Sequence, residues 1–368
     1  MALPMVMEIG LEGGFWRAVS DFIVMQLQLS SVFFTFSLGT KTHYFGRTIL
    51  HGGAKYRATG RGFVVRHEKF AEIYRLYSRS HFTKGLELMV LLVIYKLYGQ
   101  SSNGLVSYIL VTFSMWFLVA SWLFGPFLFN PSGFDWQKIV EDWEDWNQWF
   151  KSRGGIGVPS VKSWESWWND EQEHLKYTGL SGRFWEVVLS LRFFLYQYGL
   201  IYHLRIVKGH NQIEIYGFSW VVIAALLLLL KLVSMGRQRF GADFQLLFRL
   251  LKAGLFLVLL AILAAVLIVL NFSFNDLITC LLAFLPTGWA LLQIAQALKP
   301  LVVVSGFWDS VKALAQGYEY IMGLLLFAPV AVLAWFPFVS EFQSRLLFNQ
   351  AFSRGLQISR ILAGGRKG

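Results

Sequence analysis

The sequence contains few charged residues and a single cysteine in 368 residues. Charged residues make up 15% of the chain, hydrophobic residues 55% and aromatic residues 17%, and this composition excludes an ordinary soluble globular protein. Because Cys280 has no second cysteine to pair with, an intrachain disulfide is excluded as well. The composition leaves an integral membrane protein as the predicted class.

The first residues lack the basic segment and the small-residue cleavage site of a secretory signal peptide. Residues 1–10, MALPMVMEIG, resemble instead the end of an apolar helix that is cut midway. We therefore expect the sequence to be a piece of a longer chain.

Long apolar runs recur along the chain. A helix needs about 20 apolar residues to cross the hydrocarbon of a bilayer, and seven runs approach or exceed this length, with a shorter eighth at residues 86–98. We predict an all-α polytopic membrane protein with seven to eight transmembrane helices and amphipathic interfacial helices in two cytosolic loops. The seven longer runs are residues 21–38, 105–129, 185–207, 213–233, 250–270, 277–298 and 320–339.

These runs predict six segments. They are a truncated N-terminal helix with the first full span (1–38), a basic cytosolic segment (39–85), a helical hairpin (86–129), a tryptophan-rich cytosolic loop (130–184), a membrane helix bundle (185–339) and a basic C-terminal tail (340–368). The short, almost uncharged turn 99–104 is expected outside, which places the basic segment before it and the loop after it in the cytosol, and the excess of Lys and Arg in the tail favours the cytosol as well. If every run crosses once the tail lies outside, so either residues 327–338, with Pro329 and Pro337, are re-entrant or residues 86–98 do not cross.

Positive charge is concentrated in residues 39–85. The segment contains ten Lys and Arg residues and two acidic residues, Glu68 and Glu72, so it carries eight of the eleven net positive charges. Such a segment favours contact with lipid headgroups or with an anionic substrate. The glycine-rich residues 51–62 match neither the P-loop nor the dinucleotide fingerprint, and they fit a tight interfacial turn as well as a phosphate cradle. The candidate phosphate or headgroup contacts are Lys55, Arg57, Arg61, Arg66 and Lys69.

The end of the basic segment has the pattern of an amphipathic helix. One side carries aromatic rings and imidazoles, and the opposite side carries charged groups. The pattern predicts a helix over residues 63–82 that lies in the membrane interface with its rings at the depth of the acyl chains. The first side holds His67, Phe70, Tyr74, Tyr77 and His81, and the second holds Glu68, Glu72, Arg75 and Arg79.

The loop 130–184 holds seven of the fifteen tryptophans: Trp136, Trp143, Trp146, Trp149, Trp164, Trp167 and Trp168. Tryptophan stacks on sugar faces, lies in the aromatic belt of a membrane or fills a loop core, and we favour the belt and loop-core interpretation. A helix is predicted from Trp136, and a second one near Ser163. The apolar face of the first helix comprises Ile139, Val140, Trp143, Trp146 and Phe150.

The opposite face of the first loop helix carries Glu141, Asp142, Glu144 and Asp145. Paired carboxylates suit metal binding or acid–base chemistry, but a solvated helix face explains them more simply. We therefore assign no catalytic and no metal-binding residue to the chain.

Arg192 lies inside the predicted span 185–207, where a charged side chain is expensive and usually has a partner or a polar cavity. Tyr196, Gly199 and His203 follow it at spacings of four, three and four residues. This polar helix face suits the wall of a path enclosed by helices. The alternative is that the arginine snorkels or pairs with a nearby acid.

Stretches from all parts of the chain resemble the C-terminal membrane region of plant 1,3-β-glucan synthases, the callose synthases. The resemblance covers essentially the whole sequence. It is carried by SVFFTFSLGTKTHYFGRTILHGGAKYRATGRGFVVRHEKFAEIYRLYSRSHF from Ser31, FNPSGFDWQKIVEDW from Phe129, GGIGVPSVKSWESWW from Gly154, RFFLYQYGLIYHL from Arg192, PTGWALLQIAQALKP from Pro286 and FNQAFSRGLQISRIL from Phe348.

The resemblance implies a large plasma-membrane enzyme that transfers glucose from UDP-glucose to a growing 1,3-β-glucan and extrudes the polymer. It implies that the nucleotide-sugar domain lies upstream, so we expect the isolated chain to be inactive and to hold no cofactor, with Mg²⁺ belonging to the absent domain. The expected partners are membrane lipid, the rest of the synthase and further complex subunits, and not nucleic acid. Arg192, Tyr196 and His203 become the candidate polymer path.

The alternative function is a non-enzymatic membrane transporter or channel module. A transporter is expected to have two similar halves with interrupted helices at matching places, and the sequence shows no such repeat.

Overall fold

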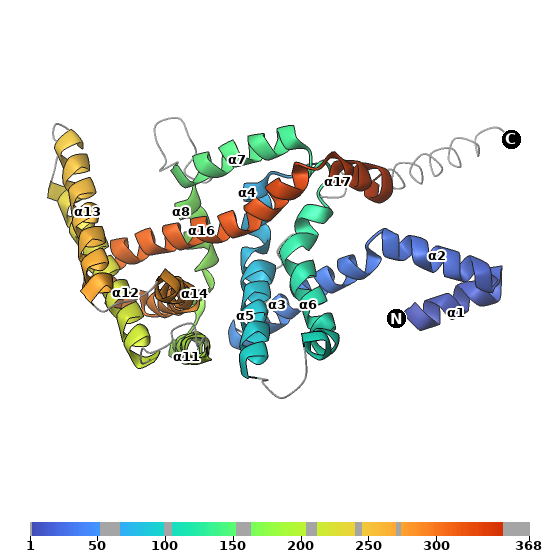
Figure 1. Ribbon diagram of the computed structural model, residues 1–368, viewed down its shortest axis with the longest axis horizontal. Coiled ribbons are helices and arrows are strands. Elements are labelled where there is room, and N and C mark those ends of the chain that lie inside the picture. Colours follow the sequence, from blue (N-terminus) through green and yellow to red (C-terminus); the bar gives the residue numbers. More distant parts are fainter. Residues whose placement is uncertain are drawn as a thin grey trace. The chain divides into compact units, whose positions relative to one another are not determined.

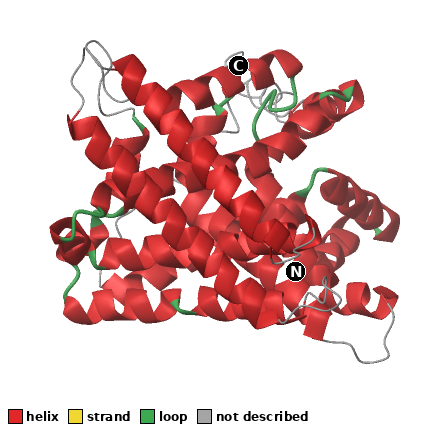
Figure 2. Cartoon of the chain, turned by 60° about the vertical axis from the view of Figure 1, so that its left-hand side comes forward, coloured by secondary structure: helices red, strands yellow, loops and turns green. Residues whose placement is uncertain are grey.

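The computed structural model describes residues 2–51, 67–98, 105–151, 163–203, 212–239, 245–269 and 274–348. Within these ranges all regular secondary structure is helical and no strand occurs (Figure 2). This result confirms the predicted all-α class.

The helices follow one another along the chain with short breaks (Figure 1). In the first half they are α1 (Ala2–Gly13), α2 (Phe15–Leu27), α3 (Ser30–His51), α4 (Phe70–Tyr77), the π-helical turn Ser78–Phe82, α5 (Thr83–Tyr98), α6 (Leu105–Leu128), α7 (Trp136–Lys151), α8 (Trp164–Glu171) and α9 (His174–Tyr177). In the second half they are α10 (Leu180–Ser190), α11 (Arg192–His203), α12 (Gln212–Arg239), α13 (Gln245–Val269), α14 (Phe274–Ala297), α15 (Lys299–Val304), α16 (Trp308–Ala334), α17 (Pro337–Phe342) and a π-helical turn, Gln343–Phe348.

The chain forms two compact units, which are described separately. The first unit comprises Met1–Met89, Val111–Ser163 and Gly323–Gly368, and the second comprises Val90–Leu110 and Trp164–Met322. The basic segment and the first tryptophan-rich helix belong to the first unit, and Arg192 belongs to the second.

Among the described residues, two helices are long and apolar enough to cross a membrane, Val106–Leu128 in α6 and the whole of α16. A third candidate is the pair α2 and α3 taken together, which bends by 56° at its break. The predicted run 21–38 is therefore not one straight helix, because the chain turns at Leu29, whose φ is 58°. The predicted total of seven to eight spans stays a prediction.

The predicted span 185–207 is also interrupted. Leu191 separates α10 from α11 while its backbone keeps helical angles (φ −61°, ψ −22°), and Arg192 is the first residue of α11. The apolar residues on both sides of Leu191 conceal this boundary in the sequence. The position of Arg192 within a membrane span stays a prediction.

The predicted interfacial helix begins later than expected. The described part of the predicted helix 63–82 starts at His67, and α4 begins at Phe70 and continues through the π-helical turn Ser78–Phe82 into α5. Phe70, Tyr74 and Tyr77 do share one face, as predicted, but protein covers all three rings. These rings therefore pack in a protein core and do not reach lipid acyl chains; the interfacial position of the helix stays a prediction.

Candidate functional site

Aromatic rings form the core of the first unit, where α4 lies beside α7 (Figure 1). The ring of Phe70 stacks on Phe127 with centroids 5.4 Å apart, and it meets the edges of Trp146 and Phe327 at 5.0 Å each. Stacked and edge-to-face pairs are the favoured geometries of aromatic rings. The core joins α4, the end of α6, α7 and the second half of α16.

The indole of Trp146 is completely buried and lies against the backbone of α16 at Gly323. A Cβ atom at Gly323 would overlap the six-membered ring of Trp146. Glycine is therefore required at this position by close approach. This contact fixes the distance between α7 and α16.

The turn between α6 and α7 is held by a reciprocal pair of hydrogen bonds. The side chain of Asn130 accepts a hydrogen bond from the backbone N–H of Glu68 and donates one to its carbonyl oxygen, both at 2.9 Å. Buried amides of this kind need both bonds to offset their desolvation. The pair ties the end of the basic segment to the turn.

Gln343 closes the same turn from the C-terminal side of the unit. Its Nε2 lies within hydrogen-bond distance of the carbonyl oxygens of Phe127, Leu128 and Asn130, at 3.3, 3.0 and 2.8 Å. The last carbonyls of a helix have no intrahelical partner, so this buried side chain supplies donors for the end of α6. Nothing in the sequence pattern around Gln343 indicates this role.

The acidic face of α7 contacts the end of the basic segment. Nε2 of His67 lies 3.5 Å from Oδ1 of Asp142, its Nδ1 lies 2.9 Å from the carbonyl oxygen of Pro131, and Lys69 pairs with Asp145 at 2.5 Å. Burial alone would lower the pKa of His67, but the hydrogen bond and the attraction to Asp142 outweigh it and raise the pKa above its ordinary value. Asp142 is 5% exposed, so the prediction of a fully solvated acidic face is wrong at this residue.

The tryptophans of the loop mostly fill cores, as the favoured interpretation predicts. Within the first unit Trp146 and Trp149 are buried, and within the second unit Trp164, Trp167 and Trp168 are buried. The predicted apolar face of α7 is wrong in one respect, because Val140 is exposed and Trp149 takes its place. Of the other two tryptophans, Trp143 is half-buried and Trp136 is 53% exposed.

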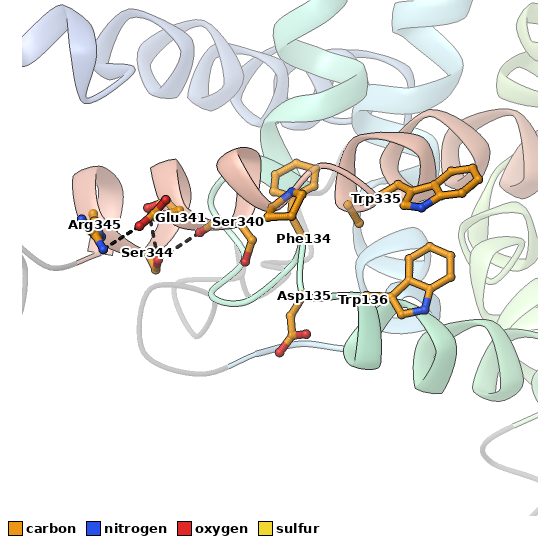
Figure 3. A pocket seen from close by; sticks show the side chains of 10 residues that line it. Phe134, Asp135, Trp136, Trp335, Ser340, Glu341, Ser344 and Arg345 are labelled. Carbon is orange, nitrogen blue, oxygen red and sulfur yellow. Dashed lines mark hydrogen bonds and ion pairs between the residues drawn. The ribbon is translucent and has the colours of Figure 1, made fainter.

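Trp136 lines a groove of about 830 Å³ between the start of α7 and the segment that follows α16 (Figure 3). Trp335 lies next to it, with ring centroids 6.4 Å apart and planes inclined by 31°. Glu341 pairs with Arg345 at 2.5 Å. The lining residues labelled in the figure are Phe134, Asp135, Trp136, Trp335, Ser340, Glu341, Ser344 and Arg345, and Ala334 and Pro337 complete the lining.

The predicted polar face lies in the second unit. Arg192 donates a hydrogen bond to the carbonyl oxygen of Leu189 at the end of α10, and its guanidinium lies 4.4 Å from the ring centroid of Phe193. Tyr196 is half-buried and meets the edge of Phe193 at 5.7 Å. The side chain of His203 lies outside the described residues. Gln197 of α11 is completely buried, and the sequence interpretation did not select it.

A second polar contact lies nearby in the same unit. Ser190 donates a hydrogen bond of 2.9 Å to the side-chain oxygen of Gln293 in α14. Neither residue is charged, and the spacing argument from Arg192 missed both.

Of the five candidate phosphate contacts, Lys69 is described and pairs with Asp145, whereas Lys55, Arg57, Arg61 and Arg66 lie outside the described residues. Among the residues that the structure describes, no three His, Cys, Asp or Glu side chains come together in a way that could hold a metal ion.

A family profile described as 1,3-beta-glucan synthase component matches residues 1–193 of the 368. The chain belongs to this family. Three similar glucan synthases, callose synthases 5, 7 and 3 of Arabidopsis thaliana, are 66%, 66% and 64% identical to it over 99–100% of its length. The chain spans 19% of the length of each of these proteins. No solved structure matches the sequence.

Proposed function

We propose that this chain is the C-terminal transmembrane part of a 1,3-β-glucan synthase that polymerises glucose from UDP-glucose and extrudes the glucan across the plasma membrane. The observation that carries the proposal is the 66% identity to callose synthase 5 over the whole of this chain. Two helices that are long and apolar enough to cross a membrane support the integral membrane location. We assign the activity to a longer protein that contains this chain, because callose synthase 5 is about five times as long as this chain.

Transfer from a nucleotide sugar needs groups that hold a diphosphate and a carboxylate that accepts the proton of the acceptor hydroxyl. In the described part of the chain, the carboxylates of Asp142 and Asp145 are engaged by His67 and Lys69. We therefore assign the transfer step to the remainder of the synthase and derive no step through Mg²⁺ for this chain.

The role that we assign to this chain is a membrane scaffold and glucan conduit. The basic segment meets headgroups or substrate phosphate through Lys55, Arg57, Arg61 and Arg66, and it is anchored at its end by the contacts of His67 and Lys69 to α7. Arg192, Tyr196 and His203 line the polymer path.

The test is synthesis of polymer by the full-length synthase that contains this chain, purified in lipid with labelled UDP-glucose and Mg²⁺. We expect insoluble product that a 1,3-β-glucanase digests, at a level above that of a heat-killed control. The isolated chain, assayed in parallel, is expected to give only the control level. A full-length protein that makes no such product contradicts the proposed function, and an active isolated chain contradicts the assignment of the chemistry to the remainder.

Replacement of Arg192 by leucine in the full-length enzyme tests the conduit. We expect lower polymer output at unchanged expression, because the guanidinium offers charged donors to a polyhydroxylated chain. Normal output of this variant contradicts the path through Arg192.

A further inference from the structure

The groove beside Trp136 and Trp335 has the chemistry of a carbohydrate site. Its volume of about 830 Å³ falls within the range of ligand pockets, about 300–1,000 Å³. The core tryptophans of this unit are buried, yet Trp136 is 53% exposed and Trp335 is 75% exposed. Two large aromatic surfaces are thus left open side by side at this groove, in contrast to the buried rings of Trp146 and Trp149 in the same unit.

The two indoles form one end of the groove, Glu341, Ser344 and Arg345 lie at the other end, and Asp135 lies beside Trp136 (Figure 3). A ring centroid distance of 6.4 Å leaves no room for a ligand between the indoles, so a ligand would lie across them. The flat apolar C–H face of a hexose suits such a platform, because the negative face of an aromatic ring attracts the partly positive C–H hydrogens.

The polar end supplies groups for hydroxyls. Glu341 is a carboxylate that accepts hydrogen bonds, and Arg345 donates them while it pairs with Glu341. The carboxylate of Asp135, beside Trp136, accepts the backbone N–H of Gln137 at Oδ1 and has its second oxygen as a further acceptor. Ser344 uses its hydroxyl hydrogen within its own helical turn, toward the carbonyl oxygens of Ser340 and Glu341, so its oxygen is left to accept. Acceptors therefore predominate, and they match a ligand that is rich in O–H donors.

The charge of the groove disfavours a lipid headgroup. Two carboxylates and one guanidinium give a net charge of minus one, and the guanidinium is already neutralised by Glu341. An anionic phosphate would be repelled, whereas a neutral oligosaccharide meets no such penalty.

We propose that this groove binds neutral 1,3-β-linked glucose oligomers, with Trp136 and Trp335 as a stacking platform and Asp135 and Glu341 as hydroxyl acceptors. The choice of this linkage rests on the proposed function, and the chemistry of the groove gives the class of neutral oligosaccharide. The groove is a holding site for glucan on the scaffold and takes no part in glucose transfer.

The experiment measures binding of a 1,3-β-linked glucose hexamer to the full-length synthase by calorimetry, with 1,4-α- and 1,4-β-linked hexamers for comparison. Loss of one stacking ring is expected to weaken binding of the 1,3-β hexamer about tenfold in Trp136→Ala and in Trp335→Ala. Glu341→Gln should weaken it about threefold. Trp185→Ala is the matched control, because Trp185 is 51% exposed and belongs to the other unit.

Two results would overturn the proposal. The first is that Trp136→Ala and Trp335→Ala bind the 1,3-β hexamer as tightly as Trp185→Ala does, or that the wild type binds a 1,4-linked hexamer more tightly than the 1,3-β hexamer. The second is that Trp136→Ala and Trp335→Ala change binding to phosphatidylglycerol vesicles but leave hexamer binding unchanged. That result would make the groove a lipid site. Polymer synthesis by the wild-type enzyme is measured separately, so failure of the groove and failure of the proposed function are distinguishable.

Discussion

Single residues set the spacing of helices in the first unit. Gly323 admits the indole of Trp146, and Gly39 admits the imidazole of His81, whose nearest ring atoms lie 2.7 Å from the position that a Cβ would take. Both contacts join segments that are distant in sequence. A glycine in an apolar helix does not reveal which distant side chain packs against it, so neither contact could be predicted from the sequence.

Gly323→Ala is expected to destabilise the protein by about 1–3 kcal/mol, because a methyl group added to a filled core forces the indole of Trp146 to move. The measurement is thermal unfolding in detergent. Gly317→Ala in the same helix is the control, since no atom lies within 4 Å of the added Cβ and alanine favours a helix. Equal melting temperatures for the two variants would contradict the packing.

His81 makes the folding stability of the protein depend on pH. Its Nε2 lies 2.8 Å from the carbonyl oxygen of Phe36 and its Nδ1 lies 2.7 Å from the hydroxyl of Ser80, so the neutral ring donates from Nε2 and accepts at Nδ1. Burial lowers its pKa to about 4. An unfolded histidine titrates near 6.5, so the stabilisation is complete above that pH and is lost as the pH falls toward 4.

The shift corresponds to about 3 kcal/mol of folding free energy. We expect the melting temperature of the wild type to fall between pH 6.5 and 4 more steeply than that of His81→Gln. His67 acts in the opposite direction, because its raised pKa gives stability that is present below about 6.5 and lost as the pH rises. The difference between wild type and variant isolates His81, and parallel curves would refute its role.

The boundaries of helices were predictable from the sequence where neighbouring residues determine them. The sequence Asn-Pro-Ser-Gly ends α6, and the periodic pattern that follows placed a helix from Trp136, which is where α7 begins. The burial of Asp142 was not predictable, since it depends on His67 from a different segment. The break at Leu191 was missed because a turn flanked by apolar residues leaves the hydropathy unchanged.

The candidate site was less predictable than the elements. Trp136 was noted as one of seven tryptophans, but only the fold separates this exposed ring from the buried ones. Trp335 and Glu341 join it from a segment some 200 residues later, and no local pattern relates them.

Asn130 links two elements, and its replacement tests that link. Asn130→Ala removes both hydrogen bonds to the backbone of Glu68 and is expected to lower the free energy of unfolding by about 1–3 kcal/mol. The measurement is chemical denaturation in detergent micelles. Asn169→Ala, at an exposed position of α8, should change it by less than about 0.5 kcal/mol. An equally small effect of Asn130→Ala would show that the reciprocal pair contributes little.

At the scale of the whole molecule, the contacts of His67 and Lys69 to α7 lead us to expect the end of the basic segment and α7 on the same side of the membrane. We expect single cysteines at Lys69 and Glu144, introduced in a Cys280→Ser background, to react with an impermeant maleimide only after cells are permeabilised. Reaction of the two sites from opposite sides would contradict the structure. Reaction of both in intact cells would contradict the cytosolic assignment alone.

The hydrogen bonds of Gln343 bear on how the protein is made. Its partners, Phe127 to Asn130, leave the ribosome at least 213 residues earlier. At about 5–20 residues per second, translation of that interval takes roughly 10–40 s. Throughout this time the end of α6 lacks its native donor, so the first unit completes its fold only after Gln343 has been synthesised.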